Sequence, residues 1–210
     1  MLVFWIVIAA LAGYLLGGIN GAIIISRLLA HEDVRKKGSG NAGLTNFQRN
    51  YGNKGSLLVI LVDVAKTVVA CLLGGALLGQ FGMADTGRML GGAACMVGHM
   101  FPLMFGFHGG KGVLCGAALA ACMDWRAFCI VFGVFLIAVL LTRYISLGSL
   151  LAAVAYPFAF AWCFWGNWAV IAIALAVAVL AIWMHRGNIG RLAHGNERKF
   201  HLKKGKDGEA

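Results

Sequence analysis

Long apolar runs separated by short polar segments dominate the chain. Because a helix needs about 20 residues to cross ~30 Å of hydrocarbon, these runs predict membrane-spanning helices. They are residues 2–26, 56–79, 89–107, 147–165 and 168–184. The first run has no basic segment ahead of it and is followed directly by Arg27, so we expect an uncleaved span and not a signal peptide.

One further apolar stretch, 113–141, is interrupted by Asp124, Trp125 and Arg126. It contains either two short spans or one long helix with a polar position, and the charges favour two. With seven spans and the N-terminus outside, segments 27–54, 108–112, 143–146 and the C-terminal tail share one side. They carry 15 of the 18 Lys and Arg residues, the excess that cytoplasmic loops show. With six spans, Lys111 and Arg143 would lie on opposite sides.

The sequence therefore predicts an all-α integral membrane protein, a polytopic helical bundle of about seven spans with a cytoplasmic C-terminus. Composition agrees, because 60% of the 210 residues are hydrophobic and 12% are charged, against about half and a quarter in soluble domains. We expect a single membrane-embedded domain over 1–210, with 184–210 forming the cytoplasmic end of the last helix and a basic tail.

The net charge of +10 does not indicate nucleic-acid binding, because the basic residues follow the predicted topology. They suit anionic lipid or an anionic substrate. The six cysteines form no C-x-x-C pair, and we expect them to pack and not to bind a metal. Cys115, Cys122 and Cys129 recur every seven residues, as small residues on one packed helix face would.

The first polar cluster spans residues 38–49 and alternates glycine with polar side chains. Its candidate anion-binding residues are Ser39, Gly40, Asn41, Thr45, Asn46 and Arg49. Glycines permit positive φ, so successive N–H groups can converge on an anion. Thr45 and Arg49 would share a face of a short helix capped by Asn41. A glycine-rich turn with solvated charges is the equally open alternative.

The second cluster spans residues 98–112. Glycines, Gly110 among them, flank Lys111 ahead of a predicted helix. Backbone N–H groups, the helix dipole and the lysine ammonium would together attract an anion there. It is not a nucleotide P-loop, because Phe105 and Gly112 stand where that motif needs Gly and Ser or Thr. His99, at the inner end of its span, is either a packing residue or a functional one.

The third cluster follows the last span. If the helix continues past the membrane, His185, Asn188 and Arg191 fall on roughly one stripe, with Glu197 beyond them. An ordinary basic end to the span would explain the arginine but not the histidine and asparagine. Ser146 and Ser149 add hydroxyls at another cytoplasmic helix end.

Asp63 and Lys66 lie inside the second run, where charges are expensive and face a polar interior. Three residues apart, they can neutralise each other, and a contact from Lys66 to substrate is the alternative. All the polar clusters fall at cytoplasmic ends of spans and contain few acidic groups. Together they predict a composite site for an anionic substrate, without a Ser-His-Asp triad, metal quartet or carboxylate pair.

These clusters resemble the signature motifs of the bacterial acyl-phosphate:glycerol-3-phosphate acyltransferases, the PlsY family. The matching stretches are 38–46, 98–112 and 185–197, with 63–66 and 142–149 also similar. His108 stands where the family pattern has a basic residue, often Lys. The resemblance implies a multi-pass bacterial inner-membrane enzyme that works on the cytoplasmic face. It would transfer a fatty acyl group from acyl phosphate to the sn-1 hydroxyl of glycerol 3-phosphate, giving lysophosphatidic acid and phosphate, the first step of phospholipid synthesis.

The resemblance also implies residue roles. Catalysis would fall to His185, Asn188, Glu197 and Lys111. Binding of the two phosphates would involve Ser39, Gly40, Asn41, Thr45, Asn46, Arg49, Lys66, His99, Gly110, Ser146, Ser149 and Arg191. No cofactor is expected, because acyl phosphate is already activated, and the proton acceptor is either the enzyme or the substrate's own phosphate. The expected partners are both substrates, membrane lipid and the soluble enzyme that makes acyl phosphate.

The sequence also bears on two other functions. Acyltransferases with a His-x-x-x-x-Asp motif are excluded, because no histidine has Asp five residues later. A transporter of a phosphorylated metabolite would also have glycine-interrupted spans and the charges of Asp63 and Lys66. Against it, the polar clusters lie at the inner surface and not at the membrane midplane.

Overall fold

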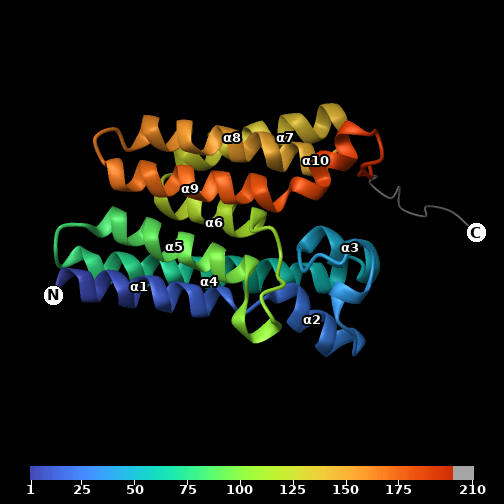
Figure 1. The fold of residues 1–210 in the computed structure, drawn as a ribbon, viewed down its shortest axis with the longest axis horizontal. Coiled ribbons are helices and arrows are strands. Elements are labelled where there is room, and N and C mark those ends of the chain that lie inside the picture. Colours follow the sequence, from blue (N-terminus) through green and yellow to red (C-terminus); the bar gives the residue numbers. More distant parts are fainter. Residues whose placement is uncertain (201–210) are drawn as a thin grey trace, which may run out of the picture.

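The computed structural model describes residues 1–200, which form helices joined by loops and turns. The long helices run side by side and alternate in direction (Figure 1). They are α1 (Leu2–Gly17), α4 (Asn53–Gly79), α5 (Ala84–Met100), α6 (Val113–Met123), α7 (Trp125–Thr142), α8 (Ile145–Cys163) and α9 (Trp168–Met184). The shorter α2 (Gly21–Ala30), α3 (Leu44–Tyr51) and α10 (Arg186–Ala193) gather at the end opposite the N-terminus.

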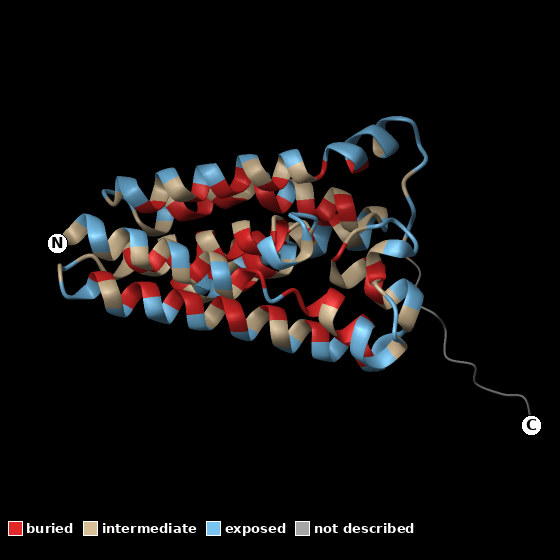
Figure 2. Cartoon of the chain, turned by 60° about the horizontal axis from the view of Figure 1, so that its bottom comes forward, coloured by how far each residue is buried: buried red, intermediate tan, exposed pale blue. Residues whose placement is uncertain are grey.

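The outer faces of the long helices are apolar. Leu136, Ile137, Leu140 and Leu141 are exposed along α7, and comparable side chains line α1, α4, α8 and α9. Figure 2 shows the exposed positions facing outward and the buried ones facing the centre of the bundle. A continuous apolar exterior of this kind suits lipid and not water, so the predicted helical membrane protein is confirmed.

Four helical segments are long and apolar enough to cross a membrane: Leu2–Ala30, Asn53–Gly79, Trp125–Thr142 and Ile145–Cys163. Trp168–Met184 and Arg186–Ala193 make a fifth if that pair, bent by 55°, is one span. Helices α5 and α6, with 17 and 11 residues, are shorter than the usual span. The predicted count of seven spans therefore stays a prediction.

Glycines bring α5 close to two neighbours. A Cβ on Gly13 of α1 would collide with the Gly91 carbonyl oxygen, and one on Gly74 of α4 with that of Gly87. Small residues allow helix backbones to approach closely in lipid, where packing is the main attraction between helices. The main hydrophobic core lies largely between α5 and α9 and consists mostly of Ala, Met, Val and aromatic side chains.

The apolar run 2–26 is interrupted at residues 18–20, although α1 and α2 lie within one candidate span, Leu2–Ala30. Helix α1 ends at Gly17, and α2 begins at Gly21, where the Asn20 side chain accepts a hydrogen bond from Ile23 N at 3.1 Å. The backbone carbonyls of Gly17 and Ile19 instead accept hydrogen bonds from Lys66 Nζ, at 3.1 and 2.8 Å. A side chain from α4 thus takes over carbonyls at the interruption.

One further boundary differs from expectation, and another agrees with it. The run 89–107 becomes a helix over Ala84–Met100, because Phe101 precedes Pro102 and residues before proline disfavour helical geometry. The stretch 113–141 forms two helices, as the charges favoured, and Asp124 caps the second by accepting from Arg126 N at 2.7 Å. Cys129 consequently lies on α7, exposed, so the expected common face of three cysteines is wrong.

Candidate active site

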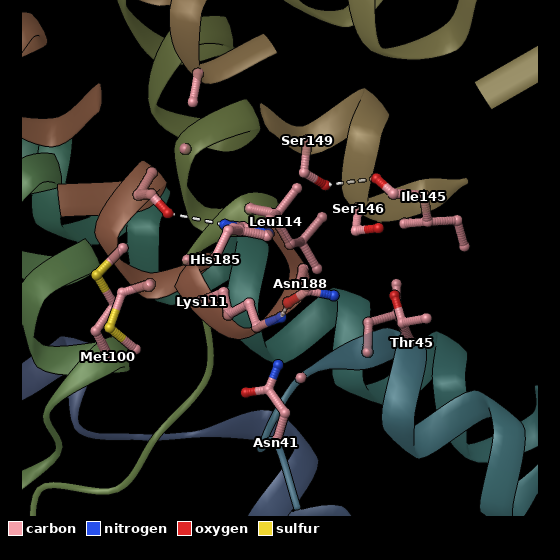
Figure 3. A pocket seen from close by; sticks show the side chains of 18 of the residues that line it. Asn41, Thr45, Met100, Lys111, Leu114, Ile145, Ser146, Ser149, His185 and Asn188 are labelled. Carbon is pink, nitrogen blue, oxygen red and sulfur yellow. Dashed lines mark hydrogen bonds between the residues drawn. The ribbon is translucent and has the colours of Figure 1, made fainter. Parts of the chain in front are cut away.

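A cavity of about 1140 Å³ opens at the end of the bundle where α2, α3 and α10 gather. Its polar end is formed by the loop before α3, the loop before α6, the start of α8 and the α9–α10 junction (Figure 3). Its other walls are apolar side chains of α5 to α9, including Met96, Phe132, Phe135, Ala152 and Val177. The cavity therefore combines a polar site with an apolar groove.

The loop before α3 is organised by Asn46. Its Nδ2 donates to the carbonyls of Val34, Lys37 and Asn41 at 3.0–3.1 Å, and its Oδ1 accepts from Ser39 N at 3.0 Å. The positive φ expected at the glycines is present at Gly38 and Gly40, 63° and 72°.

The expected nest of free N–H groups in this loop is wrong in part. Ser39 N is bound to Asn46, and Gly40 N donates to Lys37 O at 3.1 Å. These amides are used in folding the loop, so the groups that it presents to the cavity are mainly side chains. The expected cap is also wrong, since Gly43 and not Asn41 precedes α3. Thr45 and Arg49 do lie one turn apart on α3, and both line the cavity.

Lys111 lies immediately before α6, next to Gly112, whose φ of 75° lets the chain turn into the helix. Its Nζ donates a hydrogen bond to Asn188 Oδ1 (Figure 3). Burial, with the nearby charges of Arg191 and Arg49, lowers the pKa of Lys111 to about 8. This cationic crowding favours an anion in the cavity.

The α9–α10 junction carries the third cluster. The helix does not continue straight, because α10 bends by 55° from α9 at His185. His185 Nδ1 lies 2.8 Å from Ala181 O, an acceptor only, so Nδ1 carries the proton and Nε2 presents a lone pair. Burial lowers the pKa of His185, which favours this neutral form. Despite the bend, His185, Asn188 and Arg191 all line the cavity as expected.

Glu197 joins this cluster from the segment after α10. Its Oε1 accepts from Asn188 Nδ2, and its Oε2 accepts from Arg191 Nε, both at 2.8 Å. Burial alone would raise the pKa of Glu197, but the hydrogen bonds, chiefly that from Asn188, hold it below its ordinary value. A chain of contacts thus runs from Lys111 through Asn188 and Glu197 to Arg191.

Two serines at the start of α8 complete the polar end. Ser149 Oγ donates to Ile145 O at 2.9 Å. Ser146 Oγ is buried and makes no hydrogen bond of normal geometry within residues 1–200, although it lies near enough to Glu197 to help lower the pKa of that carboxyl. The Ser146 hydroxyl lines the cavity and can also face a ligand there.

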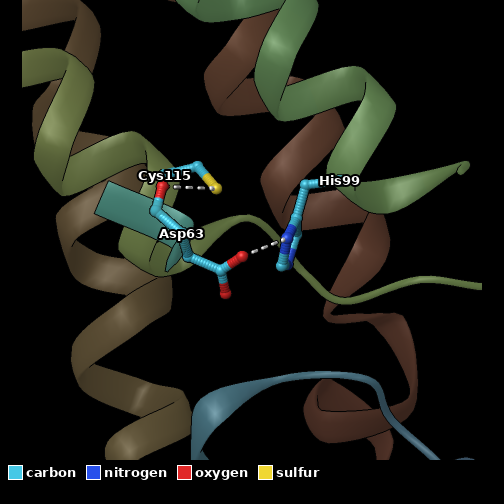
Figure 4. Close-up of side chains that lie close together, drawn as sticks. All are labelled: Asp63, His99 and Cys115. Atoms are coloured by element: carbon cyan, nitrogen blue, oxygen red, sulfur yellow. Dashed lines mark hydrogen bonds and ion pairs between the residues drawn. The ribbon is translucent and has the colours of Figure 1, made fainter. Parts of the chain in front are cut away.

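The buried charges lie beside the polar end. Lys66 Nζ contacts Asp63 Oδ1 at 2.7 Å and His99 Nδ1 at 3.0 Å, so the expected neutralising pair is confirmed. Asp63, His99 and Cys115 are close enough to hold a metal (Figure 4). The Lys66 ammonium, however, already supplies a cation between the carboxylate and the imidazole, which makes a metal there a poor fit.

The cavity brings together most of the residues singled out from the sequence. These are Ser39, Gly40, Asn41, Thr45, Asn46, Arg49, His99, Lys111, Ser146, Ser149, His185, Asn188, Arg191 and Glu197. Lys66 and Gly110 do not line it. A Cβ on Gly110 would collide with His99 Nε2, so this glycine lets the Lys111 loop pack on the histidine. His108 is exposed at the rim.

Sequence reasoning missed Arg35 and Asn20. Arg35 Nη1 donates to the carbonyls of Phe105 and His108 at 2.7 and 3.0 Å, while its other nitrogens hold Asp33. It ties the Lys111 loop to the loop before α3. Asn20 Nδ2 donates to Ala42 O at 3.2 Å, joining that loop to the start of α2. For Asn20, the sequence signal that could have found it is an amide side chain within the apolar run 2–26.

The chain is similar throughout to known membrane acyltransferases. A family model described as glycerol-3-phosphate acyltransferase matches residues 7–195. A glycerol-3-phosphate acyltransferase of Thermoanaerobacter sp. (strain X514) is 36% identical over 92% of this chain and 95% of its own length. A glycerol-3-phosphate acyltransferase of Ralstonia pickettii (strain 12J) is 38% identical over 94% of this chain and 95% of its own length.

Solved structures agree with these sequence matches. The crystal structure of PlsY, an integral membrane glycerol 3-phosphate acyltransferase, in its glycerol 3-phosphate form superposes with a TM-score of 0.83. It is 32% identical and covers 95% of this chain and 96% of that one. The lysophosphatidic acid form of that protein superposes with a TM-score of 0.81 and covers 93% of this chain and 95% of that one. The chain belongs to the glycerol-3-phosphate acyltransferase family.

Proposed function

We propose that this protein transfers a fatty acyl group from acyl phosphate to the sn-1 hydroxyl of glycerol 3-phosphate, releasing lysophosphatidic acid and phosphate. The observation that carries the proposal is the composition of the cavity described above. Cationic and hydroxyl side chains line its polar end, and apolar side chains of five helices line the rest. An anionic acceptor and a lipid donor can therefore meet at the boundary between the two regions.

The cationic side chains divide between the two phosphates. Arg49, with Thr45 on the same face of α3, serves one anion, with Ser39 and Asn41 nearby on the preceding loop. Lys111 and Arg191 serve the other, together with the hydroxyl of Ser146. Holding two reactants in reacting geometry can contribute ~7–11 kcal/mol to the barrier reduction, so no protein nucleophile is required.

The reaction balances without a cofactor. The acceptor hydroxyl oxygen attacks the acyl carbonyl carbon, a new C–O ester bond forms, and the bond from that carbon to the phosphate oxygen breaks. Lys111 and the Asn188 amide stabilise charge that develops on the carbonyl oxygen and the departing phosphate. The hydroxyl proton goes either to His185 Nε2, which presents a lone pair, or to a phosphate oxygen.

A pair of substitutions distinguishes these two routes for the proton. If His185 is the base, His185→Gln should bind glycerol 3-phosphate normally and lose 10²–10⁴-fold in turnover, the usual size of general-base catalysis. If a phosphate oxygen takes the proton, His185→Gln should retain turnover within about tenfold. Asn188→Ala serves as the comparison, because it removes an electrostatic contact without touching the base.

The charge distribution supports a cytoplasmic active site. Arg27, Arg35, Lys54 and Arg143 lie in the segments at the same end as the cavity, and Arg88 and Arg126 lie towards the other end. Exposed tryptophans at 125, 162, 165 and 168 form a belt at that other end, as at membrane interfaces. We infer seven crossings by α1 and α4–α9 in one membrane domain of the bacterial inner membrane, with the N-terminus outside.

The reaction is tested with purified protein in detergent and labelled glycerol 3-phosphate. Lysophosphatidic acid formed with palmitoyl phosphate, and not with palmitoyl-CoA, is the expected result. Turnover with palmitoyl-CoA alone would overturn the assigned donor. A folded protein that makes no product from either donor would overturn the enzyme assignment. Acyl phosphate comes from a separate soluble enzyme in this scheme, which would be a functional partner at the cytoplasmic face.

A further inference from the structure

The apolar groove of the cavity ends at a definite depth. Along α8 the lining residues are Ile145, Ser146, Ser149, Ala152, Ala153 and Tyr156, and none beyond Tyr156. The lining also stops at Ala117 on α6, Val131 on α7 and Val177 on α9. Each of these helices continues past the last lining residue, so the groove closes while the bundle goes on.

The space beyond this depth is filled by packed side chains. Met123 of α6, Phe160 of α8 and Ala174 of α9 are buried in one hydrophobic core and do not line the cavity. Phe160 has no exposed surface. A chain entering from the polar end therefore meets a closed floor inside the α6–α9 half of the bundle.

Tyr156 is the largest side chain in this floor. Its ring stacks on Phe160, with centroids 4.7 Å apart and an interplanar angle of 19°. Its hydroxyl donates to Gly116 O on α6 at 3.2 Å, and the residue is only 4% exposed. Anchored at both ends, the ring is held across the gap between α6 and α8.

We propose that Tyr156 sets the acyl-chain length that this protein prefers. The inference rests on the proposed function, in which the acyl carbonyl lies near Ser149 and the chain extends along α8. Seven residues separate Ser149 from Tyr156, about 10 Å of helix at 1.5 Å per residue. A chain long enough to reach the ring must bend or leave the groove, and each methylene then left unburied reduces affinity by about fourfold.

Two substitutions should move the preference in opposite directions. Tyr156→Val opens the floor towards the core and should raise kcat/KM for stearoyl phosphate relative to lauroyl phosphate by about tenfold or more. Ala152→Leu, one turn nearer the polar end, shortens the groove and should lower the same ratio. The KM for glycerol 3-phosphate should stay unchanged in both, because neither position lies at the polar end.

Two controls separate groove length from general effects on the fold. Tyr156→Phe keeps the ring and removes the hydroxyl, so the ratio should stay within about twofold of the original. Ala159→Val adds volume on α8 in the core just beyond the groove, where Ala159 is buried without lining it, and should leave the ratio unchanged.

The outcomes distinguish this inference from the proposed function. Folded, active Tyr156→Val with an unchanged ratio would overturn the role of Tyr156 and mean that the chain leaves the groove elsewhere. If that variant does not fold, Ala152→Leu decides alone, and an unchanged ratio there has the same meaning. Absence of turnover by the unsubstituted protein with every acyl phosphate would instead overturn the proposed reaction.

Discussion

Lys111 Nζ donates a hydrogen bond to Asn188 Oδ1, across 77 residues of sequence. The contact joins the loop before α6 to the first turn of α10, and Asn188 in turn donates to Glu197. An amide held between an ammonium and a carboxylate has only one favourable orientation, because its oxygen must face the donor and its nitrogen the acceptor. The two helices that close the cavity are thus tied by polar side chains that also face its interior.

The pKa of Lys111, lowered to about 8, predicts a pH dependence of substrate binding. Lysine is charged below its pKa, so attraction for the phosphate is present below about pH 8 and lost as pH rises through it. We expect the KM for palmitoyl phosphate, whose phosphate Lys111 contacts in the proposed reaction, to rise towards tenfold per pH unit above that value, measured at constant ionic strength. Lys111→Arg, which stays charged, should flatten this rise, and an equal rise in that variant would contradict the assignment to Lys111.

Glu197 is predicted to act by orienting Asn188. Glu197→Ala leaves the amide free to rotate and should lower kcat by about 10–100-fold, since loss of one oriented donor costs about 10²–10³ in known cases. Glu197→Gln keeps an oxygen for Asn188 and should lose less. Both variants are assayed by steady-state kinetics, with Glu32→Gln, an exposed acidic residue paired with Lys37, as the control. Equal losses in Ala and Gln variants would indicate that the negative charge itself matters.

Arg35 should affect activity although it does not line the cavity. Its guanidinium holds two carbonyls of the loop that precedes Lys111 and two oxygens of Asp33. Lysine has no planar fork, so Arg35→Lys should lower kcat/KM by about tenfold and lower the melting temperature. Lys36→Ala, at an exposed neighbouring position, controls for charge loss. Wild-type kinetics in Arg35→Lys would show that the loop keeps its position without this clamp.

Breaking the buried Asp63–Lys66 pair should destabilise the protein strongly. Lys66→Met leaves Asp63 buried without its countercharge, a change that costs about 3–5 kcal/mol in buried pairs. The double substitution Asp63→Leu with Lys66→Met should recover part of that loss, and the carbonyls of Gly17 and Ile19 would still lack their donor. Thermal unfolding in detergent measures both. A double variant less stable than the single one would mean that Asp63 contributes mainly through Gly21 N and His99.

Sequence by itself determined that this is a helical membrane protein with its polar clusters gathered at one end. Both conclusions rest on local properties. An apolar run predicts a helix in lipid wherever it occurs in the chain. Glycine, arginine and histidine near helix ends predict a polar site from their residue types alone. The division of 113–141 at Asp124 could also be predicted from the sequence, because a charged residue that caps a helix is a local signal.

Tertiary structure alone decided which carbonyls, amides and side chains meet. The first apolar run is interrupted where Lys66, from a different helix, takes the carbonyls of Gly17 and Ile19. The amides of the loop before α3 are occupied by Asn46 and Lys37, so this loop offers side chains to an anion and not the nest that its glycines suggested. The groove stops where the Tyr156 ring packs on Phe160 beside α6. Each of these contacts joins residues that are far apart in the sequence or depends on which neighbouring group reaches a hydrogen-bonding partner first. The spacing of residues along the chain therefore does not predict them.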